Sequence, residues 1–321
     1  MSFDLLADNL TNPALLFFIL GILAVLVKSD LEIPPGSSKF ISLYLLFAIG
    51  FKGGQELSHE ELSTEIIMSM GFGILIAAAI PLYTFVVLRR KLNIYDAGAI
   101  AAAYGSVSAV TFVTAVSFLE MNNLKLNGHM VAIMALMESP AIIAGLLLIS
   151  FCNKKDQNIN KQQALTHSLT NGSVLLIIGS LIIGFMASAE QAEGIKPFTN
   201  DLFKGFLAIF LLDMGIVSGR KLKSLIAEGW FPLAFSIAIP IVNGCVVAVL
   251  SSLVTDDISN RFIFSILAAS ASYIAVPAAM KIAVPKANPG LFIPMALAVT
   301  FPVNITIGMP IYYMVVKAIV L

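Results

Sequence analysis

Two clusters of small and hydroxyl-bearing residues interrupt long apolar stretches of the chain. The first is Tyr-Gly-Ser-Val-Ser-Ala-Val-Thr at residues 104–111, and the second is Ala-Ser-Ala-Ser-Tyr-Ile-Ala-Val-Pro at residues 269–277. A helix unwound there presents free N–H groups and about half a positive charge at the start of its second part, which favours anions. Its freed carbonyls and hydroxyls suit an alkali cation. The clusters therefore predict an anion site beside a cation site, although small residues also serve close helix packing.

Two carboxyl groups lie deepest in apolar sequence, Glu138 in Met-Glu-Ser-Pro and Asp213 in Leu-Leu-Asp-Met-Gly. A charge at the centre of a membrane span costs roughly 3 kcal/mol or more, so such a group marks a transport pathway by default. We predict that Glu138 is a cation ligand near the two clusters. A proton-carrying carboxyl and a buried hydrogen-bonding acid are the alternatives. For Asp213, which lies toward Arg220 and Lys221, a structural role is as well supported as a functional one.

The overall composition excludes most soluble proteins. Of the 321 residues, 58% are hydrophobic and only 12% are charged, whereas soluble domains carry about 25% charged residues. Lys and Arg together number 19, as do Asp and Glu, so nothing indicates binding to nucleic acid. Two cysteines and three histidines form no disulfide framework, zinc spacing or metal-hydrolase motif. Neither a nucleophile elbow nor a paired-aspartate motif occurs in the spans, so we predict no enzymatic activity and no cofactor.

The elements that carry these residues are ten apolar runs, each read as a membrane-spanning helix. They lie at 13–27, 40–57, 66–88, 97–119, 129–151, 170–187, 201–219, 230–254, 261–281 and 291–318. The first run has the acidic flank Asp4 and Asp8 instead of a basic one, so a short span is expected there and not a signal peptide. The sequence thus predicts an all-α integral membrane protein with ten transmembrane helices.

The loop charges predict the orientation of these spans. The loops on one side carry 13 Lys and Arg and those on the other side carry 6, and the richer side is cytoplasmic by the positive-inside rule. Both termini are therefore expected outside, and a polar linker at 153–168 inside. Lys52 is expected at the opposite membrane interface, near Glu56.

Motifs on either side of the linker recur in the same order. Met134-Ala-Leu-Met-Glu138-Ser-Pro140-Ala returns as Met295-Ala-Leu-Ala-Val-Thr300-Phe-Pro302-Val with one insertion. Gly50, Gly54 and Leu57 match Gly215, Gly219 and Leu222, and Pro81 matches Pro240, at shifts of 159 to 165 residues. We predict two five-helix units, 1–152 and 169–321. Because five is odd, the second unit enters the membrane inverted, which is a secondary-transporter architecture.

At these residues the chain resembles the sodium-dependent bicarbonate transporter family of cyanobacterial inorganic-carbon uptake. The resembling stretches are 104–111, 137–141, 269–280 and 300–308. The resemblance implies a 5+5 inverted repeat with two discontinuous helices, a core and a gate domain, and sodium-coupled bicarbonate import by alternating access. It also implies a multi-pass protein of the plasma (inner) membrane, a homo-oligomer, specifically a trimer, and a PII-like regulatory partner.

The resemblance also carries over site residues by matching position. The bicarbonate site would be lined by Gly105, Ser106, Ser108, Ser270, Ser272 and Tyr273. The sodium ligands would come from Ser108, Thr111, Glu138, Thr300 and Asn304. Glu138 stands where the resemblance leads us to expect the shorter Asp. The alternatives are a symporter of another small anion, a cation/proton antiporter of related fold, and a membrane receptor or scaffold without transport.

Overall fold

The computed structural model describes residues 9, 11–60, 63–152, 166 and 172–320, and every regular element in this part of the chain is helical. The first half contains α2 (Pro13–Leu26), α3 (Pro35–Ser58), α4 (Thr64–Leu88), α5 (Ile94–Gly105), α6 (Ala109–Met121) and α7 (His129–Cys152). The second half contains α9 (Gly172–Met186), α10 (Ala189–Lys196), α11 (Phe203–Ala227), α12 (Trp230–Leu250), α13 (Ile258–Ala269), α14 (Ala275–Ala283), α15 (Pro289–Pro294), α16 (Phe301–Val303) and α17 (Met309–Val320). The all-helical prediction is confirmed for these residues, whereas the predicted linker at 153–168, apart from residue 166, lies outside them.

Six helical stretches of the described chain are long and apolar enough to cross a membrane. They are Thr64–Leu88, Ile94–Met121, His129–Cys152, Ala189–Ala227, Trp230–Leu253 and Pro289–Ile319. The helices α2, α9 and α13 are apolar but shorter. Each of the ten predicted spans coincides with a helix or a helix pair, but four of them fall short in length or hydropathy, so the count of ten stays a prediction.

Both predicted interruptions are present, and they match each other closely. Helices α5 and α13 each contain 12 residues, and their side-chain N-caps are Asn93 and Asp257. Each ends at a serine with extended backbone, Ser106 or Ser270, and the chain resumes as α6 or α14. The prediction of two discontinuous helices is therefore confirmed at 106–108 and 270–274.

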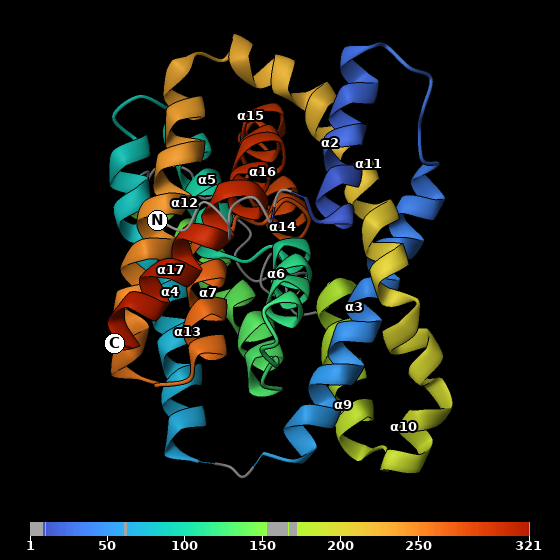
Figure 1. Ribbon diagram of the computed structural model, residues 1–321. Helices are drawn as coiled ribbons and strands as arrows, with labels where there is room; N and C mark the ends of the chain where they lie inside the picture. The colour runs from blue at the N-terminus through green and yellow to red at the C-terminus, as the bar shows by residue number, and fades with distance from the viewer. Residues whose placement is uncertain (1–8, 10, 61–62, 153–165, 167–171, 321) are drawn as a thin grey trace.

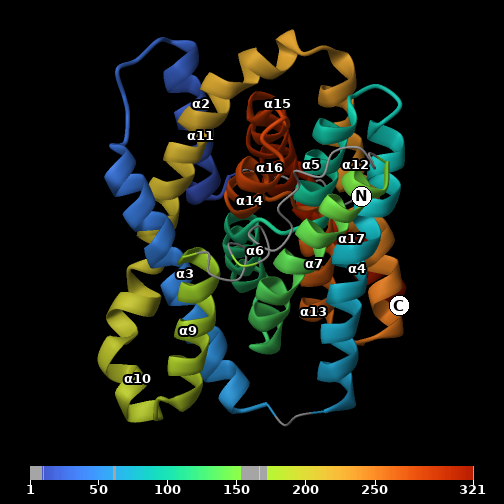
Figure 2. The same cartoon turned by 180° about the vertical axis from the view of Figure 1, so that it is seen from behind.

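The helices gather into two groups (Figures 1 and 2). In what we call the small bundle, α2 packs along α11 and α3 packs along α9. In what we call the large bundle, α4 packs on α5 and α7, and α12 packs on α13 and α17. The short helices α6 and α14 lie where the two bundles meet (Figure 1). The two interruptions therefore lie against the surface between the bundles.

Glycines allow the paired helices of the small bundle, α3 with α9 and α2 with α11, to pack closely. A methyl group added to Gly54 would collide with the carbonyl oxygen of Leu181 and lie 2.9 Å from the Cα atom of Gly184. One added to Gly215 would lie 3.1 Å from the Cα atom of Gly21. Gly54 and Gly215 thus have the same role, 161 positions apart, and not Gly50 and Gly215 as the motif match indicates. The alignment of the two motifs by residue type is therefore wrong by about one helical turn. Each motif contains two glycines four residues apart, so a shift of four residues still aligns a glycine with a glycine.

The last predicted span contains two stretches of π-helix, Met295–Thr300 and Asn304–Gly308, on either side of Pro302. The first of them covers the segment that carries one more residue than Met134–Pro140 in α7. A π-helical turn accommodates one extra residue without breaking the helix, and such turns are frequent at functional sites. The insertion between the two copies of the motif is therefore absorbed as a local widening of the helix.

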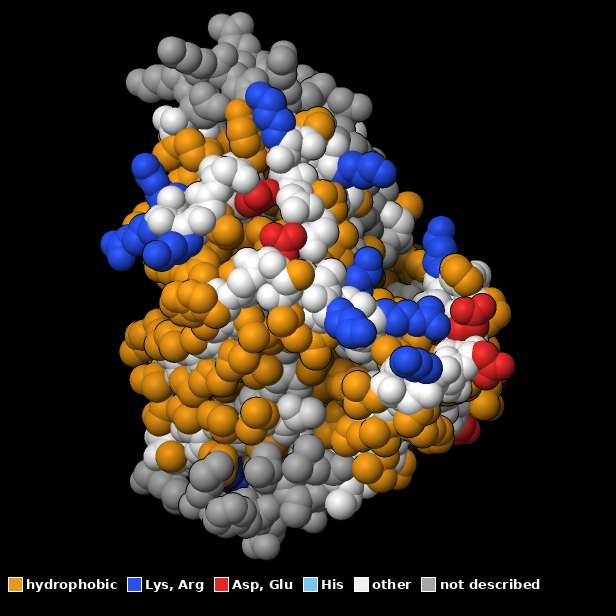
Figure 3. All heavy atoms as spheres, turned by 90° about the horizontal axis from the view of Figure 1, so that it is seen from above, with side chains coloured by type: hydrophobic (Ala, Val, Ile, Leu, Met, Phe, Trp, Pro, Cys, Tyr) orange, Lys and Arg blue, Asp and Glu red, His pale blue; other side chains and the backbone are white. Residues whose placement is uncertain are grey.

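The two ends of the molecule differ in charge. Figure 3 shows the end where α2 and α11 finish and α12 begins, and Lys and Arg side chains gather there with few acidic ones. The basic residues at this end are Lys28, Lys39, Arg89, Arg90, Lys91, Arg220, Lys221, Lys223, Lys281 and Lys286. Most acidic side chains belong to the opposite end, for example Glu190, Glu193, Asp256 and Asp257. We call the two ends the basic face and the acidic face.

Candidate functional site

The two interruptions hold each other by direct hydrogen bonds. The N–H of Ser272 donates to the carbonyl oxygen of Ala103 at 2.8 Å. In the reverse direction, the N–H of Ser108 donates to the hydroxyl of Ser270 at 3.1 Å. Each extended segment therefore satisfies a backbone group of the other, which a continuous helix would have satisfied internally. This crossing fixes the starts of α6 and α14 relative to each other.

The carbonyl groups freed at the end of α13 are occupied by amide side chains. The side-chain NH₂ of Asn304 donates to the carbonyl of Ala269 at 2.8 Å, and that of Asn243 donates to the carbonyl of Ala268 at 3.2 Å. The oxygen of Asn304 in turn accepts from the hydroxyl of Tyr312 at 2.9 Å. Asn304, a predicted sodium ligand, thus has both its amide nitrogen and its oxygen engaged in holding the interruption.

Thr300 is engaged in the same way. Its hydroxyl donates to the carbonyl of Ser236 at 2.8 Å and lies 2.7 Å from the hydroxyl of Tyr104. Since a hydroxyl has one proton to give, Tyr104 must be the donor in the second bond. These bonds tie the end of α5 to α12 and to the last span.

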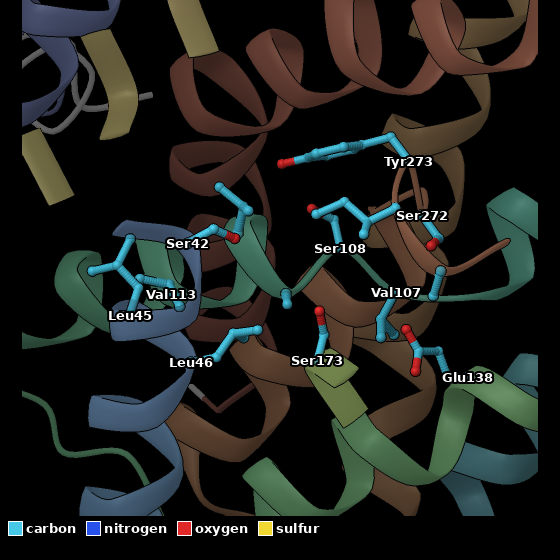
Figure 4. A pocket seen from close by; sticks show the side chains of 14 residues that line it. Ser42, Leu45, Leu46, Val107, Ser108, Val113, Glu138, Ser173, Ser272 and Tyr273 are labelled. Atoms are coloured by element: carbon cyan, nitrogen blue, oxygen red, sulfur yellow. The ribbon is translucent and has the colours of Figure 1, made fainter. Parts of the chain in front are cut away.

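The N-terminal ends of α6 and α14, by contrast, open onto a small cavity (Figure 4). The N–H groups of Ala109 and Val110 and those of Ile274 and Ala275 make no hydrogen bond within the described chain. All four residues line the cavity. Two positive half-helix ends with free donors therefore face the same cavity, which is the arrangement that binds an anion.

Side chains of four predicted site residues also line this cavity: Ser108, Glu138, Ser272 and Tyr273. Ser108 caps α6 by accepting from the N–H of Thr111 at 3.2 Å, and Ser272 accepts from Val276 at 3.3 Å. The buried hydroxyl of Tyr273 has no hydrogen-bond partner within the described chain, so it is available to a ligand. These residues come from both interruptions.

Glu138 contributes the charged group of the cavity. It projects from α7 toward Val107 (Figure 4), and in the described chain it makes no hydrogen bond or ion pair. Among the described residues, no Lys or Arg lines the cavity. A carboxylate removed from bulk water without a counter-ion is costly, and a bound cation would compensate its charge.

The other predicted site residues do not line the cavity. Gly105 packs against the ring of Pro81, and the hydroxyl of Ser106 is fully buried and has no hydrogen-bond partner among the described residues. Ser270 donates to the carbonyl of Leu267 at 3.0 Å and supports the crossing. Thr111 lies in the first turn of α6 and is buried.

Sequence reasoning missed the wall that the small bundle provides. Ser42, Leu45 and Leu46 of α3 and Ser173 of α9 complete the cavity lining (Figure 4). A serine within an otherwise apolar run, as at position 42, is the one signal that could have indicated this wall. The cavity therefore lies between the two bundles and not inside one of them.

Two charged residues singled out in the sequence, Asp213 and Lys52, lie outside the cavity. Asp213 accepts a hydrogen bond from the hydroxyl of Ser38, within the small bundle, which accords with the structural role. Lys52, expected beside Glu56, instead forms an ion pair with Glu120 at 2.9 Å. The sequence could not reveal this partner because Glu120 belongs to α6, a helix that is distant in the chain and lies between the two bundles.

Comparison with models of known protein families gives a match over most of the chain. Residues 13–317 match the family described as the Na⁺-dependent bicarbonate transporter superfamily. No curated protein matches the chain.

Proposed function

The chain belongs to the Na⁺-dependent bicarbonate transporter superfamily, and we propose that it is a symporter that carries bicarbonate inward with sodium by alternating access. Membership of a transporter family implies that the chain is not an enzyme, and its apolar helices agree with a multi-pass membrane protein. The observation that carries the proposal is the cavity between the bundles, where two half-helix N-termini and the Glu138 carboxylate meet.

In this proposal the anion lies against the free N–H groups of α6 and α14. The hydroxyls of Ser108, Ser272 and Tyr273 donate to its oxygens. Sodium lies beside it on Glu138, since a hard cation prefers carboxylate and hydroxyl oxygens. Each ion lowers the cost of burying the other, because opposite charges attract strongly away from bulk water. Cooperative binding of this kind is the physical basis of symport.

We also propose an inverted repeat, an orientation in the membrane and an oligomeric state for this protein. Two five-helix units of opposite orientation are supported by the equal lengths of α5 and α13 and by the equivalent glycine contacts in the small bundle. A cytoplasmic basic face, with both termini outside and a plasma (inner) membrane location, is supported by the charge difference between the two faces. The trimer and the PII-like partner rest on the family resemblance alone.

Radiolabelled bicarbonate uptake into proteoliposomes tests the proposal. Uptake should require an inward sodium gradient and should saturate with bicarbonate. Equal uptake when potassium replaces sodium would refute the coupling. Absence of saturable flux, with ligand binding retained, would instead favour a receptor without transport.

One observation favours a second candidate, a cation/proton antiporter. Glu138 has no partner within the described chain, and such a carboxyl can exchange a proton for a cation. Thermal unfolding separates the two functions. A symporter should be stabilised by sodium and bicarbonate together more than by either alone, whereas an antiporter should respond to sodium and pH without any anion.

A further inference from the structure

A cluster of three charged side chains joins the two bundles toward the acidic face. The ammonium group of Lys52 in α3 lies 2.9 Å from Glu120, and that of Lys204 in α11 lies 3.6 Å from it. Both lysines belong to the small bundle, and Glu120 belongs to α6. Two positive charges therefore share one carboxylate, which leaves the cluster with a net charge of +1.

The cluster is accessible to water from two sides. The side chains of Lys52, Glu120 and Lys204 are 28%, 29% and 67% exposed. Lys204 lines one open cavity and Lys52 lines another. A small anion can therefore reach either lysine without any rearrangement of the helices.

Helix α6 connects this cluster to the candidate site. Its first turn, with Ala109 and Val110, lines the cavity of the candidate site, while Ser117 and Met121 near its other end line the cavity that contains Lys204. Helix α6 is continuous from Ala109 to Met121. A displacement of its first turn that is passed along the helix therefore changes the position of Glu120 relative to the two lysines.

We propose that Lys52 and Lys204 form an entry site for the transported anion and that Glu120 is an internal occupant of this site. A carboxylate and bicarbonate both present a planar, singly charged CO₂⁻ group, so a lysine pair that holds the first also suits the second. When α6 moves away from the lysines, the pair exchanges Glu120 for an anion from solution. The inference rests on the proposed function and adds to it a second, peripheral binding site for a planar monoanion.

A pair of lysines suits such a transient site. An ammonium group is a strongly hydrated point charge on a flexible stem, and it binds exposed anions weakly. Weak binding permits release toward the central cavity, as conduction through successive sites requires. The same net positive charge also attracts anions from solution, and salt screens this effect.

The variant Lys204→Gln tests the proposal, because it keeps the shorter Lys52–Glu120 pair that joins the bundles. We expect the KM for bicarbonate in expressing cells at saturating sodium to rise about twofold to fivefold, the range for one exposed charge contact, while kcat stays similar. The KM should also become less sensitive to ionic strength. Lys204→Arg should restore the wild-type KM, and Lys125→Gln, an exposed lysine at the same face, is the matched control.

The direction of the KM change distinguishes an entry site from an alternative in which the ion pairs only hold α6 against the small bundle. If the ion pairs only hold the bundles together, their loss favours the open state, so Lys204→Gln would lower the KM or leave it unchanged. Glu120→Gln frees both lysines, and we expect it to lower the KM and to steepen its dependence on ionic strength. An unchanged or lowered KM in Lys204→Gln would overturn the entry site, as would an equal rise in Lys125→Gln. Absence of sodium-dependent uptake in the unmodified protein would instead overturn the proposed function.

Thermal unfolding of each purified variant serves as the folding control. A Lys204→Gln protein with wild-type unfolding temperature and raised KM supports the entry site. If this variant fails to fold, Lys204→Arg measured at rising ionic strength takes its place, since it retains the charge. A KM that does not respond to ionic strength would then overturn the proposal.

Discussion

The hydroxyl of Ser270 joins the two interrupted helices: it accepts from the N–H of Ser108 at 3.1 Å and donates to the carbonyl of Leu267 at 3.0 Å. Ser270→Ala would leave the buried Ser108 N–H without a partner. We expect a loss of about 1–3 kcal/mol of unfolding free energy together with reduced uptake. Ser252→Ala is the control, because Ser252 is half-buried and its hydroxyl makes a solvent-exposed hydrogen bond to the carbonyl of Val249. Equal losses in the two variants, measured by thermal unfolding, would contradict this role of Ser270.

Glu138→Gln preserves the shape of the side chain and removes its charge. If Glu138 binds sodium, the sodium concentration for half-maximal uptake should rise about tenfold or more, which corresponds to the loss of one strong contact. Protein yield should change little, because Glu138 makes no hydrogen bond within the described chain. Glu56→Gln, a change of the same kind at the acidic face, is the control. Unchanged sodium activation in Glu138→Gln would remove this residue from the site.

Thr300→Val distinguishes a sodium ligand from a structural residue. The substitution removes the hydroxyl that bonds to Tyr104 and to the Ser236 carbonyl. We expect the unfolding free energy to fall by about 1–3 kcal/mol, because two buried polar groups lose a partner, while sodium activation of the remaining transport stays near wild type. A large shift in sodium activation without loss of stability would make Thr300 a ligand after all.

Gly54→Ala should disrupt the small bundle. The added methyl group would meet the backbone of α9 at Leu181 and Gly184, which cannot move away as a flexible side chain could. We expect a destabilisation of about 1–3 kcal/mol, as is typical of overpacking. Gly71→Ala, in α4, meets nothing within 4 Å, and it should be neutral or stabilising because alanine favours helix. Similar unfolding temperatures for both variants would contradict the close approach of α3 and α9.

The carboxylate of Glu60 should make the folded protein less stable at acid pH. Burial alone would raise its pKa, but the hydrogen bond and charge interaction with His129 and the hydrogen bond from the Gly128 N–H outweigh it, so the pKa lies below the ordinary 4.5. Because the folded pKa is lowered, the stabilisation is present above pH 4.5 and is lost as the pH falls through the folded value.

Unfolding temperatures between pH 7 and about pH 3 check this expectation, because the loss occurs below pH 4.5. The wild type should lose more stability over this range than Glu60→Gln, which has no carboxylate to protonate. Parallel curves for the two proteins would show that Glu60 contributes nothing to the acid sensitivity.

The sequence by itself determined the helical class and the places where two helices break. Continuous apolar runs leave helices to satisfy the backbone in a membrane, and the Ser- and Gly-containing clusters at 104–111 and 269–277 weaken the helix locally. These are properties of residues close together in the chain, so they can be read without coordinates.

Only the tertiary structure decided which polar groups face the cavity. Ser108 and Ser270 occur in similar clusters, yet Ser108 lines the cavity and Ser270 supports the crossing. Thr300 and Asn304 are engaged by Tyr104 and Tyr312, whereas Glu138 is left to the cavity. The hydrogen-bond and ion-pair partners of these side chains come from helices distant in the chain, as Glu120 does for Lys52. The role of a polar side chain depends on whether such partners already satisfy its hydrogen bonds and its charge.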